Sequence, residues 1–377
     1  MEREPNPSFI RRGATSVTGP QPAGGLASVL VPILDEIDHI DATLAILRDQ
    51  RYDGELEFLL IDGGSTDGTR PILDRVAAGD PRFRVIDNPS RYIPAALNLG
   101  LHRARGDYVV RMDAHTRYPA DYVAKGVERL RNGDVAWASG PALPHGTGRW
   151  SRRVELALTT WLGVGNAAFR RARTEVESDT GFTGVLRRET LLALGGWDEE
   201  SLVNEDGELA ARVRASGGRI VCIPEMAAAY VPRDGLRALA LQYWRYGQYR
   251  ARTSRLHPES MRRTQLLPPG VVLAAGSALL PGVVGRIARA GLALYGLAVG
   301  AACGSVVRRA AARDVAALPL VLLTMHGTWG AGFLRGCMRF GPPWGAIRRA
   351  VTPGPTAGPA PPPPGGSAER VRRSATP

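Results

Sequence analysis

The triplet Asp113-Ala114-His115 directly follows an apolar run at residues 108–112. An acid at the end of a strand, followed two residues later by a second acid, commonly holds a divalent ion against a diphosphate. Here a histidine takes the place of the second acid. Alternate residues of an extended chain point the same way, so Asp113 and His115 can both face one bound ion. Imidazole favours Mn²⁺ over Mg²⁺, and the alternative is that His115 supports the ligands or donates a hydrogen bond to substrate.

A second acidic side chain, Asp62, ends the apolar run at residues 58–61 and opens a glycine-rich turn at residues 63–68. The glycines allow the backbone to approach a ligand closely. Asp62 is the ligand candidate, because a carboxylate at a strand end accepts a hydrogen bond from the imide N–H of a base or from a ribose hydroxyl. The alternative is an Asx-rich turn with a helix cap, in which Asp67 is structural.

A pair of acids, Glu205-Asp206, opens a segment with helical spacing at Leu209 and Val213. The helix dipole stabilises acids in a first turn, which is a purely structural interpretation. A carboxylate presented at this position also suits a general base that acts on an acceptor hydroxyl. These residues alone leave both interpretations open.

Short apolar runs alternate with stretches of helical spacing over the first half of the chain. Strands are expected at residues 29–31, 58–61, 83–86, 108–112 and 135–138, with helical spacing in residues 37–47 and 72–76. This alternation predicts an α/β domain whose parallel sheet is covered on both faces. Ligands of such sheets bind beyond the carboxyl ends of the strands, where residues 32–36, 62–67 and 113–115 are expected to converge.

The chain has 377 residues and a formal charge of +12, carried almost entirely by arginine, with Lys125 as its single lysine. Base-composition drift and a polyanion-binding surface both explain this bias. The few aromatic residues are not interleaved with the arginines, so nucleic acid is not expected as a partner. Three widely spaced cysteines predict neither a disulfide framework nor a metal knuckle. The N-terminal region has no apolar signal segment, and the first domain is expected to be cytoplasmic.

Three long, mostly uncharged runs follow, at residues 266–284, 287–307 and 315–334. Each approaches the length that crosses a bilayer, and the alternative is a set of buried core helices. Prolines in the first run indicate a kinked, re-entrant or interfacial segment. Three crossings would place an arginine-bearing tail outside, against the positive-inside tendency. Two crossings and one interfacial helix would keep it inside, and the sequence does not choose between these arrangements.

Composition divides the chain into five parts. Residues 1–25 are expected to be a disordered leader and residues 341–377 a disordered, Pro-rich tail. Residues 26–240 form the α/β domain, and residues 266–340 are expected to be transmembrane or membrane-embedded helices. Between them, residues 241–265 hold arginines among Tyr and Trp. This basic juxtamembrane or interfacial helix is expected to contact anionic headgroups or a diphosphate, unless it is a solvated helix face.

Several segments occur in the order seen in one enzyme family: VLVPILDE, IDGGSTDGT, ALNLGLHRARGDYVVRMDAHTRYP, GGWDE and NEDGEL. Over residues 27–250 the chain therefore resembles the inverting family 2 glycosyltransferases, which have the GT-A fold. The variant triplet DAH and the segment HGTWGAGFLRG resemble one subgroup, the succinoglycan-biosynthesis-type glucosyltransferases, which carry C-terminal membrane segments. The resemblance implies a GT-A-type mixed, mostly parallel sheet with flanking helices.

The resemblance also implies where the nucleotide-sugar binds. Asp62 would contact the nucleotide base, and Pro32 and Glu36 would line the same pocket. Asp113 and His115 would occupy the position that holds the metal and the diphosphate. The implied cofactor is a divalent cation, Mn²⁺ or Mg²⁺.

For catalysis, the resemblance implies that Asp206 of the Glu205-Asp206 pair is the base. Gln242 and Arg245 stand where processive members carry a Gln-x-x-Arg-Trp motif, and Arg245 would pair with the diphosphate. Tyr246 replaces the tryptophan of that motif, so processive polymerisation is not inferred.

The implied reaction is a single in-line displacement, in which an acceptor hydroxyl attacks the anomeric carbon of a nucleotide-sugar, expected to be a UDP-hexose, with inversion. Attachment to the cell membrane suggests a polyprenyl-linked glycan acceptor in exopolysaccharide or cell-envelope synthesis. One alternative is a nucleotidyltransferase, although residues 31–34 lack the glycine loop expected after its first strand. The other is a membrane-tethered nucleotide-sugar-binding protein without catalysis.

Overall fold

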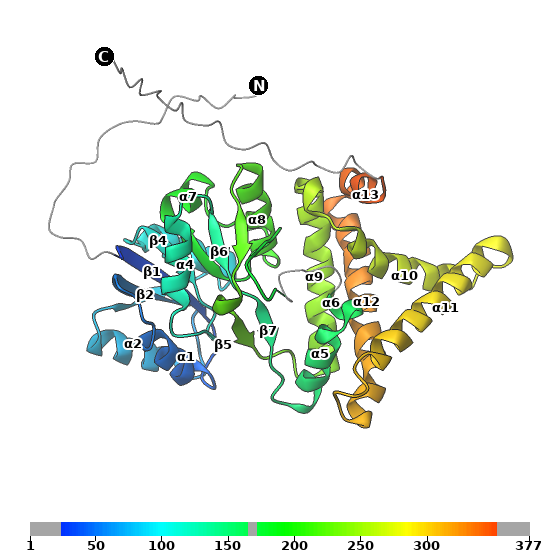
Figure 1. Cartoon of the computed structure of the whole chain (residues 1–377), viewed down its shortest axis with the longest axis horizontal. Coiled ribbons are helices and arrows are strands. Elements are labelled where there is room, and N and C mark those ends of the chain that lie inside the picture. The colour runs from blue at the N-terminus through cyan, green and yellow to red at the C-terminus, as the bar shows by residue number, and fades with distance from the viewer. Residues whose placement is uncertain (1–23, 165–171, 353–377) are drawn as a thin grey trace, which may run out of the picture.

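Buried strands alternate with amphipathic helices in the first part of the chain. The computed structural model describes residues 24–164 and 172–352, and Figure 1 shows an α/β domain beside a group of long helices. The first elements are β1 (Leu26–Ile33), α1 (Ile40–Arg48), β2 (Glu55–Asp62), α2 (Thr69–Gly79), β3 (Phe83–Asp87), α3 (Ile93–Arg103) and β4 (Tyr108–Arg111). The predicted strands at residues 29–31, 58–61, 83–86 and 108–112 fall within β1 to β4, except that β4 ends one residue earlier.

The rest of the α/β domain has shorter strands. In chain order its elements are β5 (Thr116–Arg117), α4 (Tyr122–Arg131), β6 (Trp137–Ser139), β7 (Ala142–Pro144), α5 (Arg149–Thr159), α6 (Trp161–Val164), β8 (Val176–Glu177), β9 (Gly184–Arg187), α7 (Arg188–Ala193), α8 (Glu205–Ala215), β10 (Ile220–Cys222) and β11 (Ala228–Tyr230). The strand predicted at residues 135–138 is β6, which begins two residues later.

The main sheet has eight strands in the order β3-β2-β1-β4-β9-β6-β10-β8, and β5, β11 and β7 form a small second sheet. The neighbours β3, β2, β1 and β4 are parallel. In contrast, β9 is antiparallel to both β4 and β6, and β8 is antiparallel to β10. The prediction of a mixed, mostly parallel sheet is therefore confirmed.

Helices cover both faces of this sheet, because alternate strand residues point to opposite faces. Val29 and Leu60 belong to a buried cluster that includes residues of α1, α2 and α4. Their strand neighbours Leu30 and Leu59 belong to a second cluster with residues of α3, α7 and α8. Burial on both faces explains why these strands read as continuous apolar runs in the sequence.

The helical part contains α9 (Leu236–Leu256), α10 (Leu267–Ser277), α11 (Gly282–Gly304), α12 (Ala312–Phe340) and α13 (Trp344–Val351). The basic segment predicted from residue 241 is the helix α9, which begins and ends earlier than predicted. The disordered tail predicted from residue 341 is wrong for α13, whose Ala346 and Ala350, one turn apart, are buried. Residues 1–23 of the predicted leader and residues 353–377 of the tail lie outside the described residues.

The first apolar run does not form a single long helix. It is divided between α10, which has 11 residues, and the start of α11, with a break that includes Pro281. Two helices, α11 and α12, are long and apolar enough to cross a membrane by length and composition. The alternative of buried core helices also holds in part, because Leu318 and Leu322 of α12 are fully buried in a cluster with α5, α9 and α11.

Candidate active site

Three parallel strands bring the predicted ligand loops to one edge of the sheet. In the register of β1 and β2, Ile33 lies beside Asp62, so the two strands end together. On the other side of β1, Arg111 at the end of β4 lies beside Leu30. Asp113 follows two residues later. The loops after β1, β2 and β4 therefore share the carboxyl edge of the sheet, as expected for an α/β ligand site.

Side-chain hydrogen bonds tie the loops after β1 and β2 together. The Asp67 carboxylate accepts the backbone N–H groups of Ile37, at 2.9 Å, and of Thr69, at 3.0 Å. Asp35 accepts the N–H of Thr66 at 2.7 Å and has a positive φ of 52°, a conformation that Asp and Asn tolerate better than most residues. Asp67 therefore has the structural role that the sequence offered as an alternative for this turn.

Asp62 lies beneath these loops and is 1% exposed. Its Oδ1 accepts hydrogen bonds from the backbone N–H and the hydroxyl of Ser65, at 3.0 and 2.6 Å. Its Oδ2 pairs with Arg70 at the longer distance of 3.3 Å. Since each carboxylate oxygen has two lone pairs, Oδ2 keeps capacity to accept from a ligand. Pro32, half-buried on β1, lies beside Ile61.

Arg111 holds three acidic groups together in the middle of the site. Its Nε donates to Asp113 Oδ1 at 2.8 Å, and its Nη1 donates to Glu205 at 2.9 Å and to Asp206 at 2.8 Å. The guanidinium is 6% exposed. One buried cation thus joins the end of β4 to the first turn of α8, which is 94 residues away in the sequence. The structure brings Asp113, Glu205 and Asp206 together as the predicted site requires.

The electrostatics of this cluster favour a proton on one of the acids. Burial raises the pKa of Asp206 from the usual 3.8 to about 7, with contributions from the charges of Glu205 and Asp113 and against the attraction of Arg111. Burial also opposes the charge of Arg111, but its three carboxylate partners hold its pKa well above the ordinary value. Asp206 is therefore poised to exchange a proton near neutral pH, as a general base requires.

Asp113 and His115 do not point at a common partner. The backbone N–H of Asp113 donates to the Tyr118 hydroxyl at 2.8 Å, and its carboxylate faces Arg111. The imidazole of His115 lies 3.0 Å from Glu36, and this hydrogen bond raises the pKa of His115. In residues 24–164 and 172–352, no group of three or more His, Cys, Asp and Glu side chains forms a metal cage.

This donor set nevertheless fits one kind of cation site. One carboxylate and one imidazole suit a divalent ion that receives its other ligands from substrate phosphates and water. His115 and Glu36 are both within reach of the solvent-facing edge, with side chains 50% and 16% exposed. The residues present are compatible with a cation that arrives with a diphosphate, rather than with a preformed protein cage.

The helix that carries Glu205 and Asp206 begins at an unusual residue. Asn204 adopts the left-handed conformation, with φ of 69°, and its amide donates to the Thr253 hydroxyl of α9 at 2.9 Å. The Asn204 side chain also occupies the space beside Gly207, where an added Cβ would lie 2.7 Å from the Asn204 amide oxygen. Gly207 and Asn204 are therefore matched, and together they set the start of α8 against α9.

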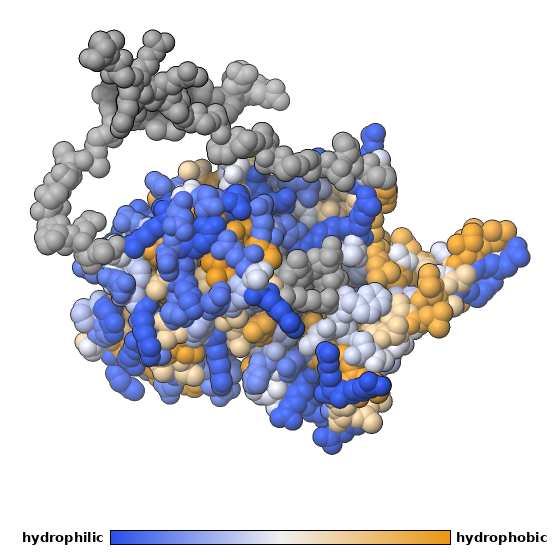
Figure 2. Space-filling view, in the orientation of Figure 1, coloured by the Kyte–Doolittle hydropathy of each residue, from blue (hydrophilic) through white to orange (hydrophobic). Residues whose placement is uncertain are grey.

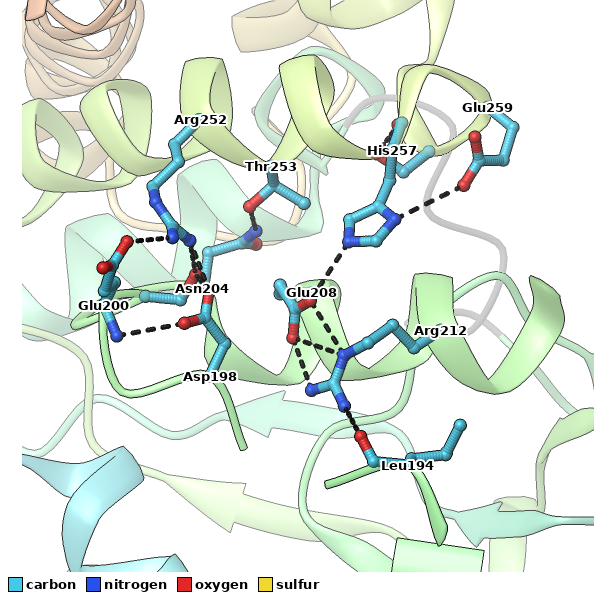
Figure 3. Close-up of polar contacts among 12 residues, drawn as sticks. Leu194, Asp198, Glu200, Asn204, Glu208, Arg212, Arg252, Thr253, His257 and Glu259 are labelled. Atoms are coloured by element: carbon cyan, nitrogen blue, oxygen red, sulfur yellow. Dashed lines mark hydrogen bonds and ion pairs between the residues drawn. The ribbon is translucent and has the colours of Figure 1, made fainter. Parts of the chain in front are cut away.

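Further contacts fasten α9 to the same region (Figure 3). The ring of His257, at the end of α9, lies 3.0 Å from Glu208 of α8. Burial opposes the charge of Glu208, but hydrogen bonds from His257 and Arg212 outweigh this effect and lower its pKa. Arg252 of α9 pairs with Asp198 and, at 2.6 Å, with Glu200 in the loop that precedes α8. The first turn of α8 is thus held by α9 on one side and by Arg111 on the other.

The predicted pair on α9 is not part of the acidic cluster. Arg245 is exposed and makes no ion pair within the described parts of the chain. Gln242 donates to the Tyr246 hydroxyl at 3.1 Å, one turn along the same helix. The structure therefore places Gln242 and Arg245 on the helix that flanks the site, without contact to Asp113 or Asp206.

Sequence reasoning missed Arg111, Asn204 and Thr253. A signal existed for Arg111, because a charged residue inside an apolar strand is rarely buried without a partner. Nothing in the sequence identifies Thr253, whose role depends on how α9 packs on α8.

Comparison with known proteins identifies the family of the chain. The model of the glycosyl transferase family 2 matches residues 28–194. The chain is 33% identical over 321 residues to the succinoglycan biosynthesis protein ExoA of Rhizobium meliloti. The matched region covers 83% of this chain and 95% of that protein. The chain belongs to glycosyl transferase family 2.

Other relatives agree with this glycosyltransferase assignment. An N-acetylglucosaminyltransferase of Sinorhizobium fredii is 28% identical over 257 residues, which covers 64% of this chain and 61% of that protein. Among solved structures, the mannosyltransferase PcManGT from Pyrobaculum calidifontis, in complex with GDP-Man and Mn2+, matches with a TM-score of 0.56 and 21% identity. It covers 86% of this chain and 91% of that chain, and the likeness supports the GT-A fold.

Replacing Arg111 tests whether the fold of this glycosyltransferase depends on the buried guanidinium of Arg111. Arg111→Met leaves three carboxylates buried together, and breaking a buried ion pair costs roughly 3–5 kcal/mol of unfolding free energy. We expect a loss of that size at about pH 8 and a smaller loss at about pH 5, where protonation neutralises the acids. Urea denaturation at both pH values measures it. Arg219→Met is the control, because it removes the partly exposed ion pair between Arg219 and Asp134. An equal loss of unfolding free energy in both variants would contradict the central role of Arg111.

Removing one hydroxyl tests the contact between α9 and α8. Thr253→Val deletes the acceptor for Asn204, and we expect kcat to fall roughly 2- to 10-fold, the equivalent of one hydrogen bond. The KM for the donor should not change, because Thr253 lies on the acid side of the site. Ser254→Ala is a matched control, since the Ser254 hydroxyl is buried without a hydrogen-bond partner among the described residues. Equal kcat values for the two variants would contradict a positioning role.

Proposed function

We propose that the chain transfers a hexosyl group from a nucleotide-sugar, a UDP-hexose in the first instance, to an acceptor hydroxyl with inversion at the anomeric carbon. The observation that carries this proposal is the Arg111 cluster, in which Asp113 from the loop after β4 meets Glu205 and Asp206 from α8. An inverting displacement needs a base on one side of the sugar and charge stabilisation at the departing diphosphate on the other. The cluster supplies the base side, at the carboxyl edge of the parallel strands.

Asp206 is the proposed base. Its pKa of about 7 means that the carboxylate forms near neutral pH and is basic enough to accept the proton that the acceptor hydroxyl gives up. Its Oδ1 is held by Arg111 at 2.8 Å, which leaves Oδ2 to face the acceptor. Glu205, also bound by Arg111, keeps the local charge negative and supports the raised pKa.

The donor would lie along the loops after β1, β2 and β4. Asp62, Pro32 and Glu36 would line the nucleotide pocket, and Oδ2 of Asp62, which pairs with Arg70 at 3.3 Å, would accept a further hydrogen bond from a base or ribose group. Asp113 and His115 would hold a divalent cation, Mn²⁺ or Mg²⁺. When bound with the diphosphate, such a cation neutralises charge on the leaving group.

Two further donor contacts belong to the proposal. Arg245 on α9 is exposed and would pair with the diphosphate when the nucleotide-sugar binds. Gln242, one turn earlier, would line the same side. The mannosyltransferase that shares the fold is in complex with GDP-Man and Mn2+, and a nucleotide-sugar together with a divalent cation is likewise what we propose for this chain.

The acceptor is proposed to be a lipid-linked glycan in exopolysaccharide synthesis. The support is the relative ExoA, named for succinoglycan biosynthesis, together with the apolar helices α11 and α12. A polyprenyl carrier would bring the acceptor hydroxyl to a catalytic domain that is attached to the cytoplasmic side of the cell membrane.

Asp206→Asn separates binding from transfer. The variant keeps the shape of the site, so we expect it to bind the nucleotide-sugar as the wild type does and to lose transfer by at least about 10²-fold. Binding is measured by calorimetry with UDP-, GDP- and dTDP-hexoses in the presence of Mn²⁺ or Mg²⁺, and transfer with bacterial membranes as acceptor. Asp74→Asn, on the exposed face of α2, is the control.

The other outcomes have distinct meanings. Unchanged turnover in Asp206→Asn would exclude Asp206 as the base. A wild-type chain that binds a nucleotide-sugar and transfers nothing would instead be a binding protein.

A further inference from the structure

α12 is long enough to cross a bilayer, yet both of its ends are fastened to the catalytic domain. Its 29 residues extend about 44 Å, against a hydrocarbon core of about 30 Å. In its most apolar stretch, 44% of α12 is buried inside the protein, against 22% of the corresponding stretch of α11. The partners that bury α12 therefore decide whether lipid can surround it.

The N-terminal end of α12 is held by α5. Asp314 pairs with Arg153 at 2.9 Å, and the Arg153 side chain is 7% exposed. In turn, α5 is anchored through the backbone N–H groups of Trp150 and Ser151, which both donate to Asp234, at 2.6 and 2.7 Å. Asp234 follows β11, so this end of α12 is tied to the strands of the catalytic domain.

The C-terminal half of α12 lies along α9. Added side-chain atoms at Gly332 and Gly336 would collide with the backbone of Trp244 and Gln248, so the two helices touch through their main chains. Near the end, the ring of Phe340 lies 5.9 Å from that of Tyr249. The helix α9 also contacts α8 and the loop that precedes it, through Arg252, Thr253 and the following residue His257 (Figure 3).

We infer that α12 does not cross the membrane, and that the arm formed by α10 and α11 lies in the interface of one leaflet on the side of the catalytic domain. The helices α5 and α9 carry several arginines, including Arg153 and Arg252, which hydrocarbon does not accommodate. If α12 crossed the bilayer, α5 at one end and α9 at the other would have to enter it as well.

The α10–α11 arm presents the apolar surface that suits this position (Figures 1 and 2). It projects from the helical part, and much of its surface is orange in the hydropathy view, with hydrophilic residues at its tip. Leu279, in the bend between α10 and α11, is 89% exposed, and Leu297 of α11 is 72% exposed. The opposite face of α11, with Tyr295 and Val299, packs into the protein. The exposed face is thus separate from the face that α11 uses for folding.

The dimensions and charges of the arm suit a position in the membrane interface better than a path across the bilayer. With 11 residues, α10 extends about 17 Å, too short for the hydrocarbon core. Arg286 and Arg289 flank the apolar face near the bend, where they can reach lipid phosphates. Exposed arginines also follow α11 and line α13: Arg308, Arg309, Arg313, Arg348 and Arg349. This charge suits an anionic leaflet, and it places the arginine-bearing tail on the catalytic side.

Cysteine labelling in sealed membrane vesicles tests the inference. In a full-length chain with Cys222→Ala, Cys303→Ala and Cys337→Ala, single cysteines are introduced as Arg313→Cys and Met338→Cys, near the two ends of α12. Leu279→Cys reports on the bend of the arm, and Asp74→Cys marks the side of the catalytic domain. A membrane-impermeant maleimide is applied to right-side-out and to inside-out vesicles. All four positions are exposed, so the fold should tolerate the substitutions.

We expect the cysteines at positions 313 and 338 to react from the same face as position 74. Labelling at position 279 should be lost in vesicles and restored in detergent. Labelling of positions 313 and 338 from opposite faces would overturn the inference, because α12 would then cross. Labelling of position 279 from the far face, or in full from the near face, would also overturn it. If the cysteine at position 279 stays protected from the maleimide in detergent and the protein is a dimer, the inference is overturned. A second copy of the chain, and not lipid, would then cover the arm.

This inference rests on the membrane association proposed above and not on the transfer reaction. Release of the chain from membranes by salt alone would contradict both the proposed membrane association and this inference. The labelling does not depend on turnover, so failure of the proposed transfer would leave its result unchanged.

Discussion

The structure depends on one buried guanidinium. Arg111 ends the strand β4 and binds Asp113, Glu205 and Asp206, which would otherwise repel one another in a site shielded from water. Because its partners come from the loop after β4 and from α8, the same interaction that balances the charge also holds these two segments together around the site. Leaving any of these charges unpaired would be costly, so Arg111 and the acids are expected to act as a unit.

The balance is incomplete, and this has a consequence for both stability and chemistry. The pKa of Asp206 is raised from 3.8 to about 7, so the folded state favours the protonated acid. Its stabilising contribution is fully present below the unfolded pKa and is lost as the pH rises through about 7. The form that can act as a base is thus the form in which the fold is less stable. The contacts of α9 with Asn204 and Glu208 help to hold α8 in place under that repulsion.

Sequence patterns predicted the parts of this arrangement that are local. The acids at the ends of β1, β2 and β4 follow buried strands, and a parallel sheet brings such ends together, so Asp62 and Asp113 were expected at one edge. Arg111 was missed because its partners lie 94 and 95 residues away, at positions that no periodicity connects. The packing of α12 on α9 depends on glycines 332 and 336, whose close contacts are invisible in a hydropathy pattern.

The pH dependence of transfer tests the central claim most directly. If Asp206 is the base that Arg111, Glu205 and Asp113 hold near neutrality, kcat/KM of the wild-type chain, which reports the groups of the free enzyme, should rise with pH to a plateau. Its half-maximum should lie near pH 7, with about a tenfold decrease for each pH unit below it. A rate that stays constant between about pH 5 and 9, measured where the fold is intact, would contradict the assignment of this cluster as the catalytic centre.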